Sequence, residues 1–227
     1  MSTIGISEQD RAGFRAQGWT ALAGRFRAAQ VKPVAQTARA LAACRPRQEL
    51  LSGIHNPFGR AAALCDPWKF LDVCESPEML DPVAALIGPD LVLWDSELYL
   101  DAGTWEHARP CEGRYWPADP LAGLVADVSL ATAQVVLADV RRAGSMPAAA
   151  SGAHYVIRYM PATSLYSRDP RFPANRIAME ERPLVNYLNQ PLWLVRGEDR
   201  AGSDFATGFA PVAPGWAADQ TFPRMEV

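Results

Sequence analysis

Histidine and lysine are scarce in this chain. Its 227 residues include three histidines, His55, His107 and His154, and lysine occurs only at Lys32 and Lys69. Few side chains can therefore serve as imidazole ligands of a metal, and nearly all the positive charge is carried by arginine. An arginine- and alanine-rich composition of this kind is typical of bacteria with GC-rich genomes.

Other absences limit the partners and the compartment. The formal net charge of -3 argues against a nucleic-acid partner. No run approaches the roughly 18 apolar residues of a membrane helix, and residues 1–10 lack the apolar core of a signal peptide. The four cysteines show no C-x-x-C spacing, which predicts a reduced, cytoplasmic protein. We expect a small-molecule partner, no membrane and no nucleic acid, and leave oligomerisation open.

The length fits a single domain with a substantial core. Helices are expected at about 7–17, where Ser7 and Asp10 have capping-box spacing, at about 28–44, and at about 76–87, which starts with Ser76-Pro77. Alternating apolar segments predict strands at about 91–100, 123–130, 134–140, 154–160 and 190–196. Helices followed by antiparallel strands predict an α+β architecture. The stretch 161–183 is expected to form a loop or short helix.

Two segments carry a resemblance to a known family. Residues 109–117 read R-P-C-E-G-R-Y-W-P, and residues 157–163 read I-R-Y-M-P-A-T. They resemble the phytanoyl-CoA dioxygenase family, non-haem iron oxygenases that use 2-oxoglutarate. The resemblance implies a double-stranded β-helix, a jelly-roll or cupin-like barrel, with N-terminal helices packed on the sheet. We expect one domain over 1–227: a helical part at about 7–88, a barrel at about 90–200 and an irregular C-terminal strap at 201–227.

The family's metal positions are altered in this sequence. The family motif reads W-H-Q-D-x-x-Y-W-P, so Pro110 stands where the first iron-binding histidine is and Glu112 where the aspartate is. Counting back from Arg158, the second histidine position falls near Arg141, and the arginine that anchors 2-oxoglutarate falls at Gly152. Proline, arginine and glycine side chains cannot replace these groups. We therefore expect no metal and no cofactor, with Fe(II) and 2-oxoglutarate as the alternative.

Some residues of the altered site could still take part in a reaction. Glu112 is the expected acid or base, Arg141 or Arg158 would hold an anionic oxygen, and Tyr115 and His107 would orient a substrate. The rest of the expected pocket comprises Trp94, Cys111, Trp116, His154 and Tyr159. The structural alternative is a salt bridge between Glu112 and one of the arginines, which would replace the metal electrostatically.

Three functions remain open from the sequence. The first is an iron-independent enzyme of secondary metabolism that acts on a small organic molecule by acid–base catalysis and positioning. The second is a non-catalytic binding or partner protein on the same scaffold. The third is an iron oxygenase with unusual ligands, drawn from His107, Cys111 and Glu112. The first hypothesis, an iron-independent enzyme, predicts an open pocket around Glu112.

Overall fold

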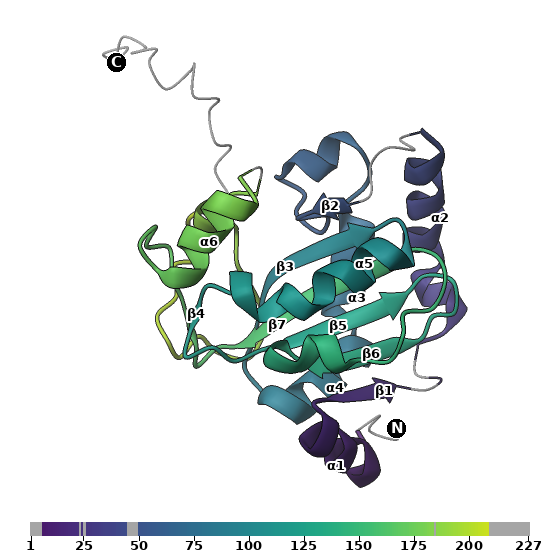
Figure 1. Ribbon diagram of the computed structural model, residues 1–227, viewed down its shortest axis with the longest axis horizontal. Coiled ribbons are helices and arrows are strands. Elements are labelled where there is room, and N and C mark those ends of the chain that lie inside the picture. Colours follow the sequence, from purple (N-terminus) through teal and green to yellow (C-terminus); the bar gives the residue numbers. More distant parts are fainter. Residues whose placement is uncertain (1–5, 23, 25, 45–49, 184, 209–227) are drawn as a thin grey trace.

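A computed structural model describes residues 6–22, 24, 26–44, 50–183 and 185–208 (Figure 1). Four helices come from the first part of the chain: α1 (Glu8–Gln17), α2 (Ala28–Cys44), α3 (Trp68–Glu75) and α4 (Pro77–Ile87), with a 3-10 turn η1 (Arg60–Ala63). Helix α1 begins with the expected capping box between Ser7 and Asp10 and ends at Gly18. The left-handed φ of 82° at Gly18 is one that glycine adopts without strain.

The core of the fold is an antiparallel sheet of seven strands. They are β1 (Trp19–Leu22), β2 (Leu50–Ser52), β3 (Leu91–Tyr99), β5 (Leu124–Ser129), β6 (Val135–Asp139), β7 (His154–Pro161) and β9 (Trp193–Arg196). Their spatial order is β1-β6-β5-β7-β3-β2, with β9 also paired to β3. Strands β5 and β6 join through a tight turn, as expected from the short 130–134 connection.

A smaller sheet and further helices complete the chain. Strands β4 (Ala118–Asp119) and β8 (Leu165–Tyr166) pair with each other. Helix α5 (Ala102–Ala108) runs across the large sheet in the view of Figure 1 and continues into the 3-10 segment η2 (Arg109–Tyr115). The remaining elements are η3 (Val140–Ser145), α6 (Pro173–Glu181) and η4 (Tyr187–Asn189).

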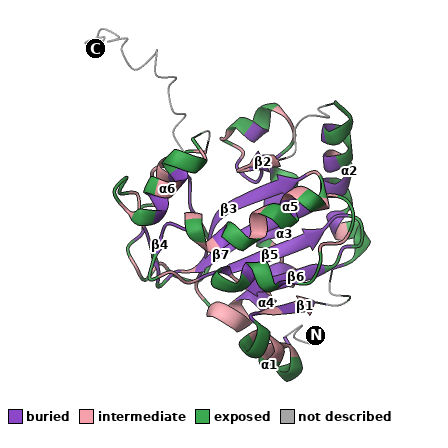
Figure 2. Cartoon of the chain, viewed as in Figure 1, coloured by how far each residue is buried: buried purple, intermediate pink, exposed green. Residues whose placement is uncertain are grey.

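The large sheet separates two apolar layers, and its central strands are buried over most of their length (Figure 2). The first layer joins one face of the sheet to α2, α3 and α4. The second joins the other face to α5, η2, η3 and α6. Successive residues of a strand enter opposite layers, because their side chains point to opposite faces of the sheet.

Strand β3 breaks this alternation at one point. Leu93 lies opposite Tyr159 of β7, but the next pair joins Asp95 to Arg158, so Trp94 is an extra residue in β3. Such a β-bulge shifts the phase of the strand. Val92 and Trp94 therefore face the second layer, and so do the odd-numbered residues that follow.

The predicted α+β double-stranded β-helix with N-terminal helices on the sheet is confirmed. The expected helices 28–44 and 76–87 match α2 and α4 within a residue, and the five expected strands match β3, β5, β6, β7 and β9. The 161–183 segment contains the short helix α6. Most of the expected strap, residues 209–227, lies outside the described residues. No helix in the described ranges is long and apolar enough to cross a membrane.

Candidate functional site

A buried ion pair joins η2 to β7 in the second layer. The Arg158 guanidinium donates from Nε to Glu112 Oε2 at 2.7 Å and from Nη2 to Glu112 Oε1 at 2.6 Å. The exposed fractions are only 4% for Glu112 and 2% for Arg158. The fork matches both carboxylate oxygens, which is the strongest geometry available to an arginine. The predicted pairing of Glu112 with Arg158 is confirmed, and both Glu112 oxygens are engaged by it.

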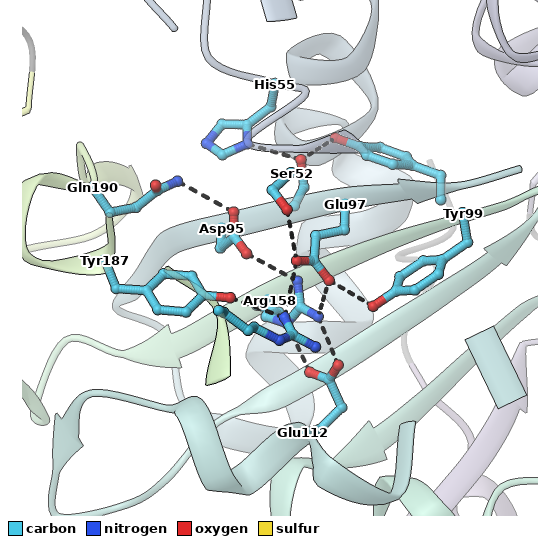
Figure 3. Close-up of polar contacts among 12 residues, drawn as sticks. Ser52, His55, Asp95, Glu97, Tyr99, Glu112, Arg158, Tyr187 and Gln190 are labelled. Carbon is cyan, nitrogen blue, oxygen red and sulfur yellow. Dashed lines mark hydrogen bonds and ion pairs between the residues drawn. The ribbon is translucent and has the colours of Figure 1, made fainter. Parts of the chain in front are cut away.

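Two more carboxyls reach the same guanidinium from β3. Arg158 Nη1 lies 3.0 Å from Asp95 Oδ2, and Nη2 lies 2.7 Å from Glu97 Oε2. Asp95 is the direct cross-strand neighbour of Arg158, and the bulge at Trp94 turns Asp95 and Glu97 to the same face. Figure 3 shows the three carboxyls converging on Arg158.

Further polar groups enclose these carboxyls. Glu97 accepts from Tyr99 at 2.6 Å and from Ser52 at 3.0 Å. Asp95 Oδ1 accepts from the Gln190 amide at 3.2 Å. Arg182, just after α6, donates to Glu97 Oε1 at 3.2 Å and to the Tyr187 hydroxyl at 3.0 Å. We call Asp95, Glu97, Glu112, Arg158 and Arg182 the charge cluster.

The charge cluster contains three carboxyls and two guanidinium groups, so one negative charge is in excess if all ionise. Burial raises the pKa of Asp95 to about 8, against the opposing pull of Arg158 and with a further push from Glu97. Burial would also raise the pKa of Glu97, but Arg158 and Arg182 outweigh it and lower that pKa to about 2. The surroundings thus shift the pKa values of two carboxyls on one strand in opposite directions.

An aromatic wall lies beside the charge cluster. Trp94 packs edge-on against Trp116, with ring centroids 5.1 Å apart, and against Tyr187 at 5.5 Å. The Arg158 guanidinium carbon lies 6.0 Å from the centre of the Trp94 ring, within cation–π range. Trp94 and Trp116 are fully buried, and their rings form part of the second apolar layer.

Three expected site residues lie elsewhere. His107 on α5, Cys111 on η2 and Arg141 on η3 are all exposed. Arg141 bonds the carbonyl of Leu121 and not Glu112. The alignment placed Arg141 at a metal position, but η3 directs its chain outward after the buried Val140, so Arg158 is the arginine of the centre.

Tyr115 lies at the edge of the charge cluster. Its hydroxyl donates to Glu181 at 2.8 Å, and the Arg182 guanidinium lies 4.3 Å above its ring. Tyr159 points the other way, into the first layer, where its hydroxyl donates to the Cys74 carbonyl at 2.8 Å. Tyr159 is therefore not part of this centre.

His154 forms a separate buried pair on the same sheet face. Its Nδ1 lies 2.6 Å from Asp127 Oδ1 and its Nε2 lies 2.7 Å from the Ala150 carbonyl. Trp105 Nε1 donates to the other Asp127 oxygen at 2.9 Å. Both ring nitrogens face acceptors, so both must carry hydrogen, and the imidazole is held as a cation. Protein groups engage both nitrogens of His154 and both oxygens of Asp127, so this pair has a structural role and does not contact a substrate.

The sequence prediction missed Asp95, Glu97 and Arg182. The signal for the first two was present, because Leu91–Tyr99 is apolar except for Asp95, Ser96 and Glu97. Acids two residues apart in a buried strand share a face and need a cation nearby. Arg182 had no comparable signal, since it lies in a segment without periodicity.

Comparison with known proteins adds information about the fold. No family model and no curated protein matches the sequence. The solved structure of CytC3 with Fe(II) and alpha-ketoglutarate matches with 15% identity and a TM-score of 0.58, over 88% of this chain and 93% of that one. The non-heme alpha ketoglutarate dependent epimerase SnoN from nogalamycin biosynthesis matches with 14% identity and a TM-score of 0.54, over 92% and 96%. The chain thus has the fold of Fe(II)/2-oxoglutarate-dependent enzymes.

The prediction that no cofactor is used is wrong for this fold. CytC3 was solved with Fe(II) and alpha-ketoglutarate, and SnoN with Fe3+ and alpha ketoglutarate. The part of the chain that the structure describes offers no group of ligands for iron, however. Within the described ranges, no three His, Cys, Asp or Glu side chains are grouped to hold a metal, and Asp95, Glu97 and Glu112 are directed at Arg158.

Proposed function

We propose that this chain is an enzyme that acts on a small organic molecule of the secondary-metabolite type, with the charge cluster as its reaction centre. The observation that carries the proposal is the convergence of Asp95, Glu97 and Glu112 on the buried Arg158 guanidinium, where burial raises the pKa of Asp95 and the two arginines lower the pKa of Glu97. Pairs of carboxyls whose surroundings separate their pKa values in this way are typical of acid–base sites. The fold, shared with enzymes such as SnoN, supports the same conclusion.

Each member of the charge cluster has a distinct part in this proposal. Asp95, with a pKa of about 8, carries a proton near neutral pH and donates or accepts it. Glu97 stays ionised and fixes the Arg158 guanidinium through Nη2. Arg158 would stabilise an oxyanion or enolate oxygen that develops on the substrate. Glu112 holds Arg158 in position. This role replaces the role of acid or base that the sequence suggested for Glu112.

A second candidate is a non-catalytic binding or partner protein. It is favoured by the saturation of the centre: Arg158 bonds Asp95, Glu97 and Glu112, and all four side chains are buried. In this case the charge cluster is a structural device, as buried arginine–carboxylate groups are in many proteins.

The test combines turnover with a pH series. Wild type and Asp95→Asn are incubated with a panel of secondary-metabolite-type compounds, with and without added Fe(II) and 2-oxoglutarate, and products are read by mass spectrometry. We expect turnover in wild type and its loss in Asp95→Asn. Turnover that survives Asp95→Asn contradicts the proposed centre. Succinate release coupled to product in both proteins would instead support an oxygenase with unusual ligands.

Stability separates the two candidates without a known substrate. The unfolded state loses the Asp95 proton near pH 4 and the folded state near pH 8, so wild-type stability should fall as pH rises between these values. Asp95→Asn removes this fall and should be the more stable protein at pH 8. An active-site carboxyl that lowers stability is expected of an enzyme. If Asp95→Asn is less stable than wild type at pH 8, the structural candidate is favoured.

A further inference from the structure

Gln190 bonds the one carboxyl oxygen of the charge cluster that no guanidinium reaches in the described part of the chain. Its amide Nε2 lies 3.2 Å from Asp95 Oδ1, whereas Arg158 Nη1 bonds the other oxygen, Oδ2, at 3.0 Å. Figure 3 shows Gln190 approaching Asp95 from one side and Arg158 from the other. Asp95 therefore has one oxygen facing a permanent donor and one facing a group that can either donate or accept.

The other two carboxyls of the charge cluster have no such oxygen. Glu112 accepts from Arg158 at both Oε1 and Oε2. Glu97 accepts from Arg182 at Oε1 and from Arg158 at Oε2. Because a guanidinium only donates, a proton on any of these four oxygens would weaken or displace a bond from an arginine. Asp95 Oδ1 is the carboxyl oxygen on which a proton disturbs none of these bonds.

The charge balance calls for one proton at this place. The titratable groups that interact with Asp95 are Glu97 on β3, Glu112 on η2, Arg158 on β7, Arg182 after α6, Tyr166 on β8 and Tyr187 on η4. Burial keeps both phenols and the nearby His55 neutral near pH 7. Three carboxyls therefore face two cations, and a buried excess charge is costly and is removed by protonation. The pKa of Asp95, which burial raises to about 8, agrees with a proton on this carboxyl.

A glutamine amide can serve both states of Asp95. It carries a carbonyl acceptor and an amino donor, and a half turn about its last side-chain bond exchanges their positions. The hydrogen-bond partners decide which orientation is taken. Nε2 facing Oδ1, as in this structure, suits an ionised Asp95, and the turned amide would accept a proton on Oδ1 through Oε1. A methyl group placed on Gly53 would meet the Gln190 amide nitrogen at 3.8 Å, so the glycine leaves room on that side.

We propose that Gln190 is a positioning residue that allows Asp95 to carry the proton of the charge cluster, by accepting through Oε1 from the protonated carboxyl and donating through Nε2 to the ionised one. Glu97 and Glu112 stay ionised in both states and keep the two arginines in place. The proton comes from solvent or from a substrate and returns to it, and no other covalent bond changes. What Asp95 does with this proton rests on the proposed function, whereas the turn of the amide does not.

Infrared difference spectra of the full chain test this proposal. Spectra at pH 6 and pH 10 lie on either side of the Asp95 pKa of about 8. We expect the C=O band of a protonated carboxylic acid at pH 6 that is lost at pH 10 and is absent from Asp95→Asn. In Gln190→Met this band should move to higher frequency, because the acid O–H has lost its acceptor. The matched control, Gln134→Met, makes the same change at an exposed position and should leave the band unchanged.

Labelling of the glutamines with 13C gives a second reading without a substitution at Gln190. A carbonyl that accepts a hydrogen bond stretches at lower frequency, so a glutamine band should lie lower at pH 6 than at pH 10 in wild type but not in Asp95→Asn. No acid band in wild type, the same acid band in Gln190→Met, or a glutamine band that ignores pH overturns the proposal. If Gln190→Met does not fold, the labelled wild type decides alone. Failure of the proposed function would show separately, as turnover that survives Asp95→Asn while both bands behave as expected.

Discussion

Asp95 and Arg158 lie directly opposite each other on β3 and β7, and their side chains meet at 3.0 Å. The pair is possible because Trp94 is an extra residue that shifts β3 by one position. Glu112, brought in by η2, then engages the remaining edge of the guanidinium. The register of β3 against β7 thus places the carboxyl of Asp95 beside the guanidinium of Arg158.

Removal of Arg158 should destabilise the protein more than removal of Glu112. Arg158→Met leaves three buried carboxyls with Arg182 as their remaining cation, whereas Glu112→Ala leaves two carboxyls and two guanidinium groups. Breaking a buried pair costs about 3–5 kcal/mol, and we expect Arg158→Met at the upper end. Urea unfolding at pH 7 measures both. Arg171→Met, which breaks an exposed pair with Asp169, should change the unfolding free energy by less than about 1 kcal/mol.

Arg158→Lys should not restore the lost stability. A lysine ammonium is a point charge without the planar fork that bonds both oxygens of Glu112. A lysine variant as stable as wild type would mean that charge alone matters at this position.

The two buried histidines should titrate far apart. Burial lowers the pKa of His55 to about 3, and its Nδ1 contacts the Ser96 hydroxyl at 2.8 Å. Burial alone would lower the pKa of His154 too, but the hydrogen bond and charge of Asp127 and the Ala150 carbonyl raise it above 6.5. NMR titration of the ring protons checks both, and His107→Gln assigns the third signal.

The raised pKa of His154 makes the stability of the protein depend on pH above neutrality. A raised folded-state pKa means that the stabilisation from His154 is complete below about pH 6.5 and is lost as pH rises through the folded value. His154→Gln should abolish this component of the pH profile, while the exposed His107→Gln should leave it in place. An identical profile for wild type and His154→Gln would contradict a charged His154.

The four thiols should react at different rates. Cys44 and Cys111 are exposed, Cys65 is half-buried and Cys74 is fully buried. Burial raises the pKa of the Cys74 thiol far above its usual range, despite a contact with Tyr155, so little thiolate forms. Iodoacetamide labelling followed by mass spectrometry should modify Cys44 and Cys111 first and Cys74 only after unfolding. Early labelling of Cys74 in folded protein would contradict its burial.

Two glycine substitutions should act in opposite directions. A methyl group at Gly123 would meet the Trp116 ring at 2.2 Å and the Tyr159 carbonyl at 2.8 Å, so Gly123→Ala should be destabilising by about 1–3 kcal/mol. Gly13 lies within α1, where alanine meets no closer atom than 3.6 Å. Gly13→Ala should stabilise by about 0.5–1 kcal/mol. Thermal unfolding of the two variants provides the comparison.

The sequence predicted the fold better than the site because the two depend on different information. Apolar alternation and caps such as Ser7 are local, and they located the main helices and strands. The position of Arg141 depended on counting across a shortened connection, and the structure turned it outward. Arg158 was named as a site residue through its I-R-Y-M-P-A-T segment. The convergence of Asp95 and Glu97 on it depends on a bulge in β3, which the apolar pattern of one strand does not indicate.

The bulge at Trp94 also decides which residues of β3 face each apolar layer. Upstream of it, even-numbered residues such as Val92 face the second layer, and downstream odd-numbered residues do. If β3 paired without the bulge, with Trp94 opposite Arg158, Asp95 and Glu97 would instead face the apolar layer beneath α3 and α4. Loss of the bulge would therefore exchange which residues of β3 enter each of the two layers, whereas a change of side chain alters only one layer.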